Sequence, residues 1–174
     1  MALSDCNPNT AIGGGPENTN YLVTNFFTFT IEKIPDFRYY VQSVNLPMLT
    51  SRSINQPAVF GTYPKIPATN FTFDDLQVTF LLDAEMKSWK SLYDWIKTLG
   101  NLKNYNDAVD HQDKFSMGTL LITNSAYKPI MKANFHHIFP VNLGSVNFSV
   151  TATTTTPVSI SANFAYSYYE IVDL

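Results

Sequence analysis

The hydrophobic pattern changes its period once along the chain, within residues 71–100. Over Leu76–Leu82 apolar and polar residues alternate, which is the period of a half-buried β-strand. From Asp83 onward apolar residues recur at steps of three and four, and this predicts an α-helix over Asp83–Leu99 closed by Gly100. Asp83 suits the N-cap, because its carboxylate can accept hydrogen bonds from free N–H groups of the first turn. The helix is expected to pack on the strand before it.

One stripe of this helix is expected to face the core. Trp89 is predicted to be its largest core contributor. Trp95 falls off the stripe of Trp89 and Tyr93, because each residue turns a helix by about 100°. We therefore predict that Trp95 is partly exposed, at an interface. The predicted core residues are Val78, Phe80, Met86, Trp89, Tyr93, Ile96 and Phe164.

The rest of the chain is predicted to be mostly strands. Apolar alternation or short apolar runs predict them near residues 26–31, 39–44, 117–123, 130–139, 146–150 and 158–168. Pro140–Gly144 is expected to be a break. Several strands with one helix in the middle predict a mainly β fold, an antiparallel β-sandwich or open barrel with one flanking α-helix.

Two segments lack the periodicity of a core element. Residues 1–24 are rich in Gly, Asn and Pro, and they are predicted to be a flexible N-terminal arm that either frays or orders against a neighbouring subunit. Residues 25–174 are then a single domain. Within it, residues 46–69 carry four prolines, three of them after Met48, and so long a connection is usually functional or disordered. The same composition is compatible with an extended hairpin, because edge strands tolerate proline.

The composition favours association over nucleic-acid binding. Charged residues make up only 14% of the chain, well below the roughly 25% of ordinary soluble proteins. So few charges protect a surface poorly, which favours a subunit covered by copies of itself over a weakly charged β-rich monomer. With a net charge of −3 and no basic cluster, neither nucleic-acid nor anionic-membrane affinity is supported. The single Cys6 allows no intrachain disulfide, and neither a signal peptide nor a membrane-spanning run is expected.

The sequence contains no pattern of catalytic or ligand-binding residues. His136 and His137 are adjacent, so in a strand their side chains point to opposite faces and do not share one metal. His111 lies beside Asp110 and Asp113, but loop carboxylates of this kind are usually solvated. Phosphate-binding, dinucleotide-binding and serine-nucleophile motifs are absent. We expect no enzymatic activity, no metal and no cofactor.

An ordered series of segments resembles the tail tube protein family of contractile-tailed bacteriophages. The series runs FTFTIEKIPDF, YVQSVNLP, INQP, FDDLQVTFLLDAEMKSWKSLYDWIKTLG, IFPVNLG and FAYSYYEI, from about Phe27 to the C-terminus. The resemblance implies two packed antiparallel sheets with a flanking helix, six subunits per ring, and strands that join across subunits into a channel wall. The expected function is a structural subunit of the inner tail tube, whose stacked hexameric rings form the conduit for DNA ejection.

Two other functions remain open at this point. One is a tube-fold baseplate initiator or tube terminator of the same tail. The other, from a different class, is an aromatic-rich β-sandwich that binds a ligand such as a carbohydrate.

The resemblance also implies partners and contact residues. The expected partners are copies of the chain, the tail sheath outside the tube, and baseplate and tube-terminator proteins. Phage DNA and the tape-measure protein would pass through the lumen without specific binding, and no membrane would be involved. The chain would belong to the virion after assembly in the host cytoplasm. The predicted contact residues between subunits or rings are Leu46, Pro47, Ile54, Gln56, Pro57, Val59, Phe60, Tyr63, Leu3, Ile12, Tyr21 and Trp95.

Overall fold

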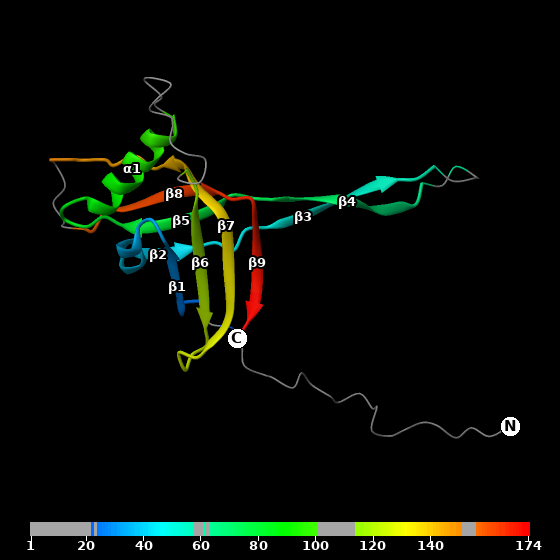
Figure 1. Cartoon of the computed structure of the whole chain (residues 1–174), viewed down its shortest axis with the longest axis horizontal. Helices are drawn as coiled ribbons and strands as arrows, with labels where there is room; N and C mark the ends of the chain where they lie inside the picture. The colour runs from blue at the N-terminus through cyan, green and yellow to red at the C-terminus, as the bar shows by residue number, and fades with distance from the viewer. Residues whose placement is uncertain (1–21, 23, 58–60, 62, 101–113, 151–155) are drawn as a thin grey trace.

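The computed structural model describes residues 22, 24–57, 61, 63–100, 114–150 and 156–174 (Figure 1). Their elements are, in chain order, β1 (Phe27–Ile31), the 3-10 helix η2 (Pro35–Tyr39), β2 (Val41–Val44), β3 (Leu49–Asn55), β4 (Lys65–Phe73), β5 (Leu76–Leu81), α1 (Lys87–Gly100), β6 (Ser116–Thr123), β7 (Pro129–Leu143), β8 (Ser159–Ala165) and β9 (Tyr168–Asp173). The strands pair antiparallel throughout this part of the chain. The mainly β fold with one α-helix is therefore confirmed.

The long strand β7 belongs to two sheets. Its first part pairs with both β6 and β9, and its last part, Phe139–Leu143, pairs with β8. One sheet has the order β1-β6-β7-β9, which we call the β9 sheet, and the other has the order β7-β8-β5-β2, which we call the β5 sheet. Figure 1 shows β5 and β8 running across the direction of β6, β7 and β9. His137 lies between the two paired parts of β7 with φ 55°, a left-handed conformation of the kind found at β-bulges.

Both sheets contribute side chains to one core. Phe29 and Phe135 of the β9 sheet pack edge to face, with ring centroids 6.5 Å apart. Phe37 of η2 lies 4.7 Å from the ring of Phe80 and 6.4 Å from that of Phe164, both in the β5 sheet. All five rings are fully buried, so the apolar positions of alternating strands form the core, as period-2 patterns predict. Val78, also predicted to be core, is fully buried too.

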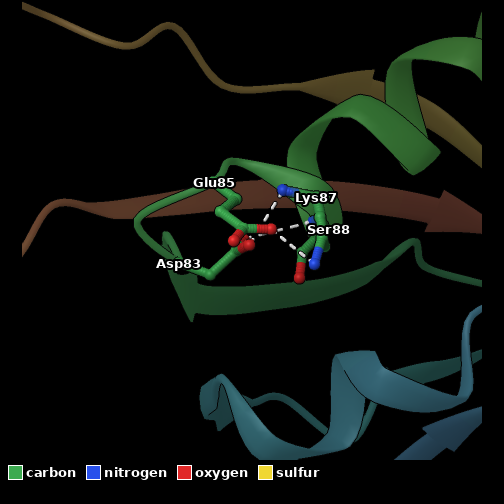
Figure 2. A network of polar contacts seen from close by, with 4 residues as sticks. All are labelled: Asp83, Glu85, Lys87 and Ser88. Atoms are coloured by element: carbon green, nitrogen blue, oxygen red, sulfur yellow. Dashed lines mark hydrogen bonds and ion pairs between the residues drawn. The ribbon is translucent and has the colours of Figure 1, made fainter.

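The helix starts later than the sequence predicts. α1 begins at Lys87, and the carboxylate of Asp83 accepts hydrogen bonds from the backbone N–H groups of Lys87 at 2.9 Å and Ser88 at 3.3 Å (Figure 2). Met86 has φ 53°, and its carbonyl accepts the first helical bond, from Lys90 at 2.9 Å. Asp83 therefore caps the helix from the turn before it, because the left-handed Met86 brings the chain back toward that carboxylate.

The buried face of the helix also differs from the predicted stripe. Ser88, Leu92 and Trp95 are buried, which is a line at steps of four and three residues. Tyr93, predicted to be core, is 45% exposed, and its ring stacks on the half-buried Trp89 at 5.4 Å. Met86 and Ile96 are half-buried as well. The core prediction was wrong for Tyr93. Trp89, predicted to be the largest core contributor of the helix, is only half-buried.

The two indole N–H groups of the helix differ in their hydrogen bonds. Nε1 of Trp95 donates to the carbonyl of Lys114 at 3.2 Å, so the ring can be buried with its polar atom paired. Nε1 of Trp89 has no hydrogen-bond partner among the residues that the structure describes. Trp95 is only 8% exposed and belongs to the core cluster. The prediction that Trp95 lies at an interface was wrong.

Three strand predictions near the C-terminus need correction. Pro140–Gly144 is not a break, because β7 continues to Leu143 and the N–H of Gly144 still donates to the Ser161 carbonyl at 2.8 Å. Pro140 fits there because its ladder partner in this part of β7 is β8 alone. Residues 146–150 form no strand. The long alternation of residues 158–168 divides into β8 and the start of β9.

Candidate assembly surfaces

The β9 sheet ends in two strands that each have one partner. Among the described strands, β1 pairs with β6 and β9 pairs with β7. The two open edges have similar lengths, five residues in β1 and six in β9. Because neighbouring strands alternate in direction across these four strands, β1 and β9 run in opposite directions. Each open edge presents backbone N–H and C=O groups that can pair with another chain.

A hairpin of β3 and β4 projects from the body of the molecule (Figure 1). Its ladder runs from Leu49 opposite Phe73 to Asn55 opposite Lys65, and Gln56 N–H donates to the Pro64 carbonyl beyond it at 3.0 Å. Large apolar side chains on and beside the hairpin are 40–67% exposed, namely Leu46, Met48, Leu49, Ile54, Tyr63, Ile66 and Phe71. Exposed apolar groups gathered on one projecting element mark a contact surface.

The hairpin is also set apart by its charge. Residues 46–73 contain Arg52 and Lys65 and neither Asp nor Glu, whereas the whole chain has a net charge of −3. Both basic side chains are on exposed residues. The hairpin therefore presents a positive, apolar surface on an otherwise acidic chain, which favours acidic or neutral partners over basic ones.

Aromatic residues hold the base of the hairpin to the body. The ring of Phe73, the last residue of β4, lies 5.9 Å from Tyr166 and 5.3 Å from Tyr169. The Tyr166 hydroxyl donates to the Asp74 carbonyl at 2.8 Å, and the Tyr169 hydroxyl donates to the Pro47 carbonyl at 3.4 Å. Burial raises the pKa of the Tyr166 hydroxyl, with smaller contributions from the neighbouring Tyr169 and acidic groups, so it remains a donor at neutral pH.

The structure places the predicted contact residues in three groups. Leu46, Ile54, Gln56, Pro57 and Tyr63 are exposed, as a contact surface requires. Pro47 is buried against its own chain, so the prediction that it contacts another subunit was wrong. The reason is that Pro47 belongs to the base of the hairpin, not to its projecting part. Leu3, Ile12, Tyr21, Val59 and Phe60 lie outside the described residues, as does most of the predicted N-terminal arm.

Sequence reasoning missed several exposed apolar residues. On the hairpin these are Leu49, Ile66 and Phe71. On β9 they are Ile171, 50% exposed, and Val172, 42% exposed. Residues 168–173 carry no clean alternation, because Tyr168 with Tyr169 and Ile171 with Val172 are adjacent apolar pairs. What the pattern could not indicate is that β9 would lie at the edge of its sheet.

The described residues show no cluster of catalytic or metal-binding side chains beside these surfaces. His136 stacks on Tyr168 at 4.5 Å, while His137 contacts the ring of Phe115 at 5.4 Å. In the described part of the chain no three His, Cys, Asp or Glu residues come together as metal ligands would. His111, Asp110 and Asp113 are outside that part. The same part contains no helix with the length and apolar character needed to cross a bilayer.

Comparison with known proteins points to one family. The family model described as phage tail tube protein matches residues 16–172. The tail tube terminator protein of Enterobacteria phage T4 is 23% identical over 160 residues, which cover 88% of this chain and 86% of that protein. The matched range of the family model spans the two sheets, the hairpin and the helix.

Solved structures share the fold at low sequence identity. A chain from the tube-terminating cap of the anti-feeding prophage has a TM-score of 0.63 at 16% identity, with 100% of both chains covered. A chain from the sheath–tube complex of the extracellular contractile injection system PVC has a TM-score of 0.61 at 16% identity, with 90% of this chain and 94% of that chain covered. Tube and terminator parts of these machines thus share this architecture. Since the family model covers most of its length, the chain belongs to the phage tail tube protein family.

Proposed function

We propose that the chain is the tube terminator of a contractile tail, a structural subunit that closes the end of the tail tube. The observation that carries the position is the match to the T4 terminator, which extends over nearly the whole of both proteins. A tube-body subunit, the function first expected from the sequence, is the second candidate, and the similarity to a chain from a sheath–tube complex supports it. Both candidates are non-enzymatic and need the same ring.

The open edges of the β9 sheet suit a ring. A head-to-tail repeat places β9 of one copy beside β1 of the next. Because the sheet holds four strands that alternate in direction, β9 and the neighbour's β1 would pair antiparallel, like every pair within the chain. Such a contact is heterologous, and it leaves no open edge when the ring closes. Six copies, the number implied by the family resemblance, would form a homohexamer.

The outward face of the β9 sheet would line the channel of this ring. Cross-strand rows on that face are Thr28, Leu121, Lys132 and Val172, and Thr30, Thr119, Asn134 and Glu170. The charged side chains in these two rows are Lys132 and Glu170, whose opposite charges cancel. We expect a nearly neutral lining of hydroxyl and amide groups over which DNA passes without specific binding. The acid excess of the chain would then lie away from this face.

The hairpin would contact the next ring of the tail. Its exposed Ile54 and Ile66 form a directly opposed pair on the projecting ladder, and Arg52 and Lys65 give it positive charge. A tube body with acidic character is the partner this surface fits. The sheath outside the tube and the baseplate complete the expected partners. Tape-measure protein and DNA would occupy the lumen, so the chain would be part of the virion.

Cysteine pairs test the ring directly. In a Cys6→Ser chain, Thr28→Cys with Val172→Cys, and separately Thr28→Cys with Glu170→Cys, place thiols on β1 and β9 in two antiparallel registers that differ by two residues. We expect one pair to give a ladder of disulfide-linked oligomers that ends at the closed ring. Thr28→Cys with Ser53→Cys, which links β1 to the hairpin, is the matched control and should give no such ladder. If neither edge pair forms oligomers, the proposed ring is wrong.

Deletion of the gene separates the two positions in the tail. A tail without its terminator should contain tubes of irregular length in electron micrographs, because nothing closes the growing end. A tail without its tube-body subunit should contain no tubes. Complete absence of tubes would therefore contradict the terminator proposal and favour the second candidate.

A further inference from the structure

We propose that Phe73, Phe135, Tyr166 and Tyr169 form a rigid joint that fixes the direction of the β3–β4 hairpin relative to β9. Through this joint, pairing of β9 with a neighbouring chain and docking of the hairpin become one coupled event. The coupling rests on the proposed ring, whereas the joint itself is a property of the single chain.

The joint holds each strand of the hairpin by one hydrogen bond at the base of that strand. Tyr169 donates to the carbonyl of Pro47, which precedes β3, at 3.4 Å. Tyr166 donates to the carbonyl of Asp74, which follows β4, at 2.8 Å. The bases of β3 and β4 are also joined to each other, since Asp74 N–H donates to the Met48 carbonyl at 3.2 Å. A two-stranded hairpin is marginal alone, so its direction depends on such anchors.

Ring packing closes the joint around these two hydrogen bonds. Phe135 of β7 lies 5.2 Å from Tyr166 and 5.6 Å from Tyr169, and the two tyrosine rings are 6.0 Å apart. Phe73 contacts both tyrosines from the hairpin side. Phe135 is fully buried in the core. The hairpin therefore leaves the body through a packed aromatic cluster instead of a free linker, and a packed cluster is stiff.

The joint and the open edge share residues. Tyr169 is the second residue of β9 and lies opposite Phe135 in the β7 ladder. A displacement of β9, for example when its open edge pairs with another chain, moves Tyr169 and with it the attachment of Pro47. Pairing that holds β9 in place also narrows the directions open to the hairpin, so less freedom is lost when the hairpin docks, and each interface should favour the other.

Distance measurements on the single chain test the joint. Spin labels at Ser53 on the hairpin and Thr28 on β1, in a Cys6→Ser chain, report the distribution of hairpin directions by electron spin resonance. We expect Tyr166→Phe with Tyr169→Phe to widen that distribution by about twofold, because both anchors are lost while the rings remain. Phe73→Leu should widen it as well. Tyr127→Phe, a change at a 76% exposed tyrosine away from the hairpin, is the control and should leave it unchanged.

The outcomes are distinct for the joint and for the ring. An unchanged distribution in both the double variant and Phe73→Leu, with circular dichroism like the parent, overturns the joint. If the parent forms no rings, the proposed ring fails while the spin-label result still decides the joint. If rings form, the double variant should keep the β1–β9 crosslink and lose docking of its ring on the ends of tail tubes in electron micrographs. Docking equal to the parent overturns the coupling.

Discussion

The core and the hairpin are built from the same residue types and differ in what covers them. Phe80 and Phe164 in the β5 sheet are fully buried, whereas Phe71 and Ile54 on the hairpin are 57% and 55% exposed. Both regions consist of antiparallel ladders with alternating side chains. The β5 sheet has the other sheet and α1 to cover it, and the projecting part of the hairpin has solvent on both faces in the single chain (Figure 1).

Apolar residues therefore have two different effects in the two regions. In the sheets they stabilise the fold of one chain, since burial of a large side chain contributes roughly 1.5–3 kcal/mol. On the hairpin they contribute little until another surface covers them. Substitutions in the two regions should therefore change different observables, unfolding free energy for the core and association for the hairpin.

The largest effect is expected in the core. Phe80→Ala should lower the unfolding free energy by about 3–5 kcal/mol, because it removes a fully buried ring and leaves a cavity beneath Phe37. Denaturant titration of the single chain gives this value. A loss below about 1 kcal/mol would mean that the β5 sheet is not part of a close-packed core.

The two tryptophans of α1 should rank next. Trp95→Ala should cost about 3 kcal/mol, since it removes an 8% exposed ring and the hydrogen bond to Lys114. Trp89→Ala should cost clearly less, because its ring is half-buried and its N–H is unpaired. The midpoints of matched denaturation curves compare them. A larger loss of unfolding free energy for Trp89→Ala would mean that the helix buries the face predicted from the sequence.

The helix cap should have a smaller, pH-dependent effect. Burial raises the pKa of Asp83, but hydrogen bonds from the backbone of Lys87 and Ser88 and the charge of Lys87 outweigh it, so the pKa is lowered. A lowered pKa in the folded state stabilises the fold above the unfolded value of 3.8, and this stability is lost as pH falls through the folded value. Asp83→Ala should cost about 1 kcal/mol at pH 7. The cost should shrink at acid pH in thermal melts, and a pH-independent cost would contradict the capping role.

The smallest effect on folding is expected on the hairpin. Ile54→Ser with Ile66→Ser removes an exposed cross-strand pair, so the unfolding free energy should change by no more than about 1 kcal/mol. The same variant should fail to dock on the ends of tail tubes in electron micrographs. Thr69→Ser, also on the exposed ladder, is the control that should dock normally. Normal docking by the double variant would remove the hairpin from the assembly surface.

The sequence predicted those parts of the fold that depend on local periodicity. The strand before α1 and the strands β1, β6 and β8 follow from alternation, and the capping role of Asp83 follows from its type and place. The helix face was not predictable in the same way, because apolar residues occupy two sides of α1. The choice between Trp89 and Trp95 depends on a carbonyl 19 residues away, at Lys114.

The candidate surfaces were predictable only in part. The prolines and weak periodicity of residues 46–69 were compatible with an extended hairpin as well as with a disordered connection, and Ile54 and Tyr63 are exposed there. The open edge of β9 depends on which strands become neighbours, and alternation carries no information about pairing partners. Pro47 shows the same limit, since the buried residue is hydrogen-bonded to Tyr169, which lies 122 residues later in the chain.

Single-particle electron microscopy of the purified chain tests the central claim most directly. At concentrations that favour association, the account predicts closed rings of six copies, with β9 of each copy beside β1 of the next and the hairpins projecting from one face. A chain that stays monomeric at every concentration, or rings in which β1 and β9 both face solvent, would contradict it.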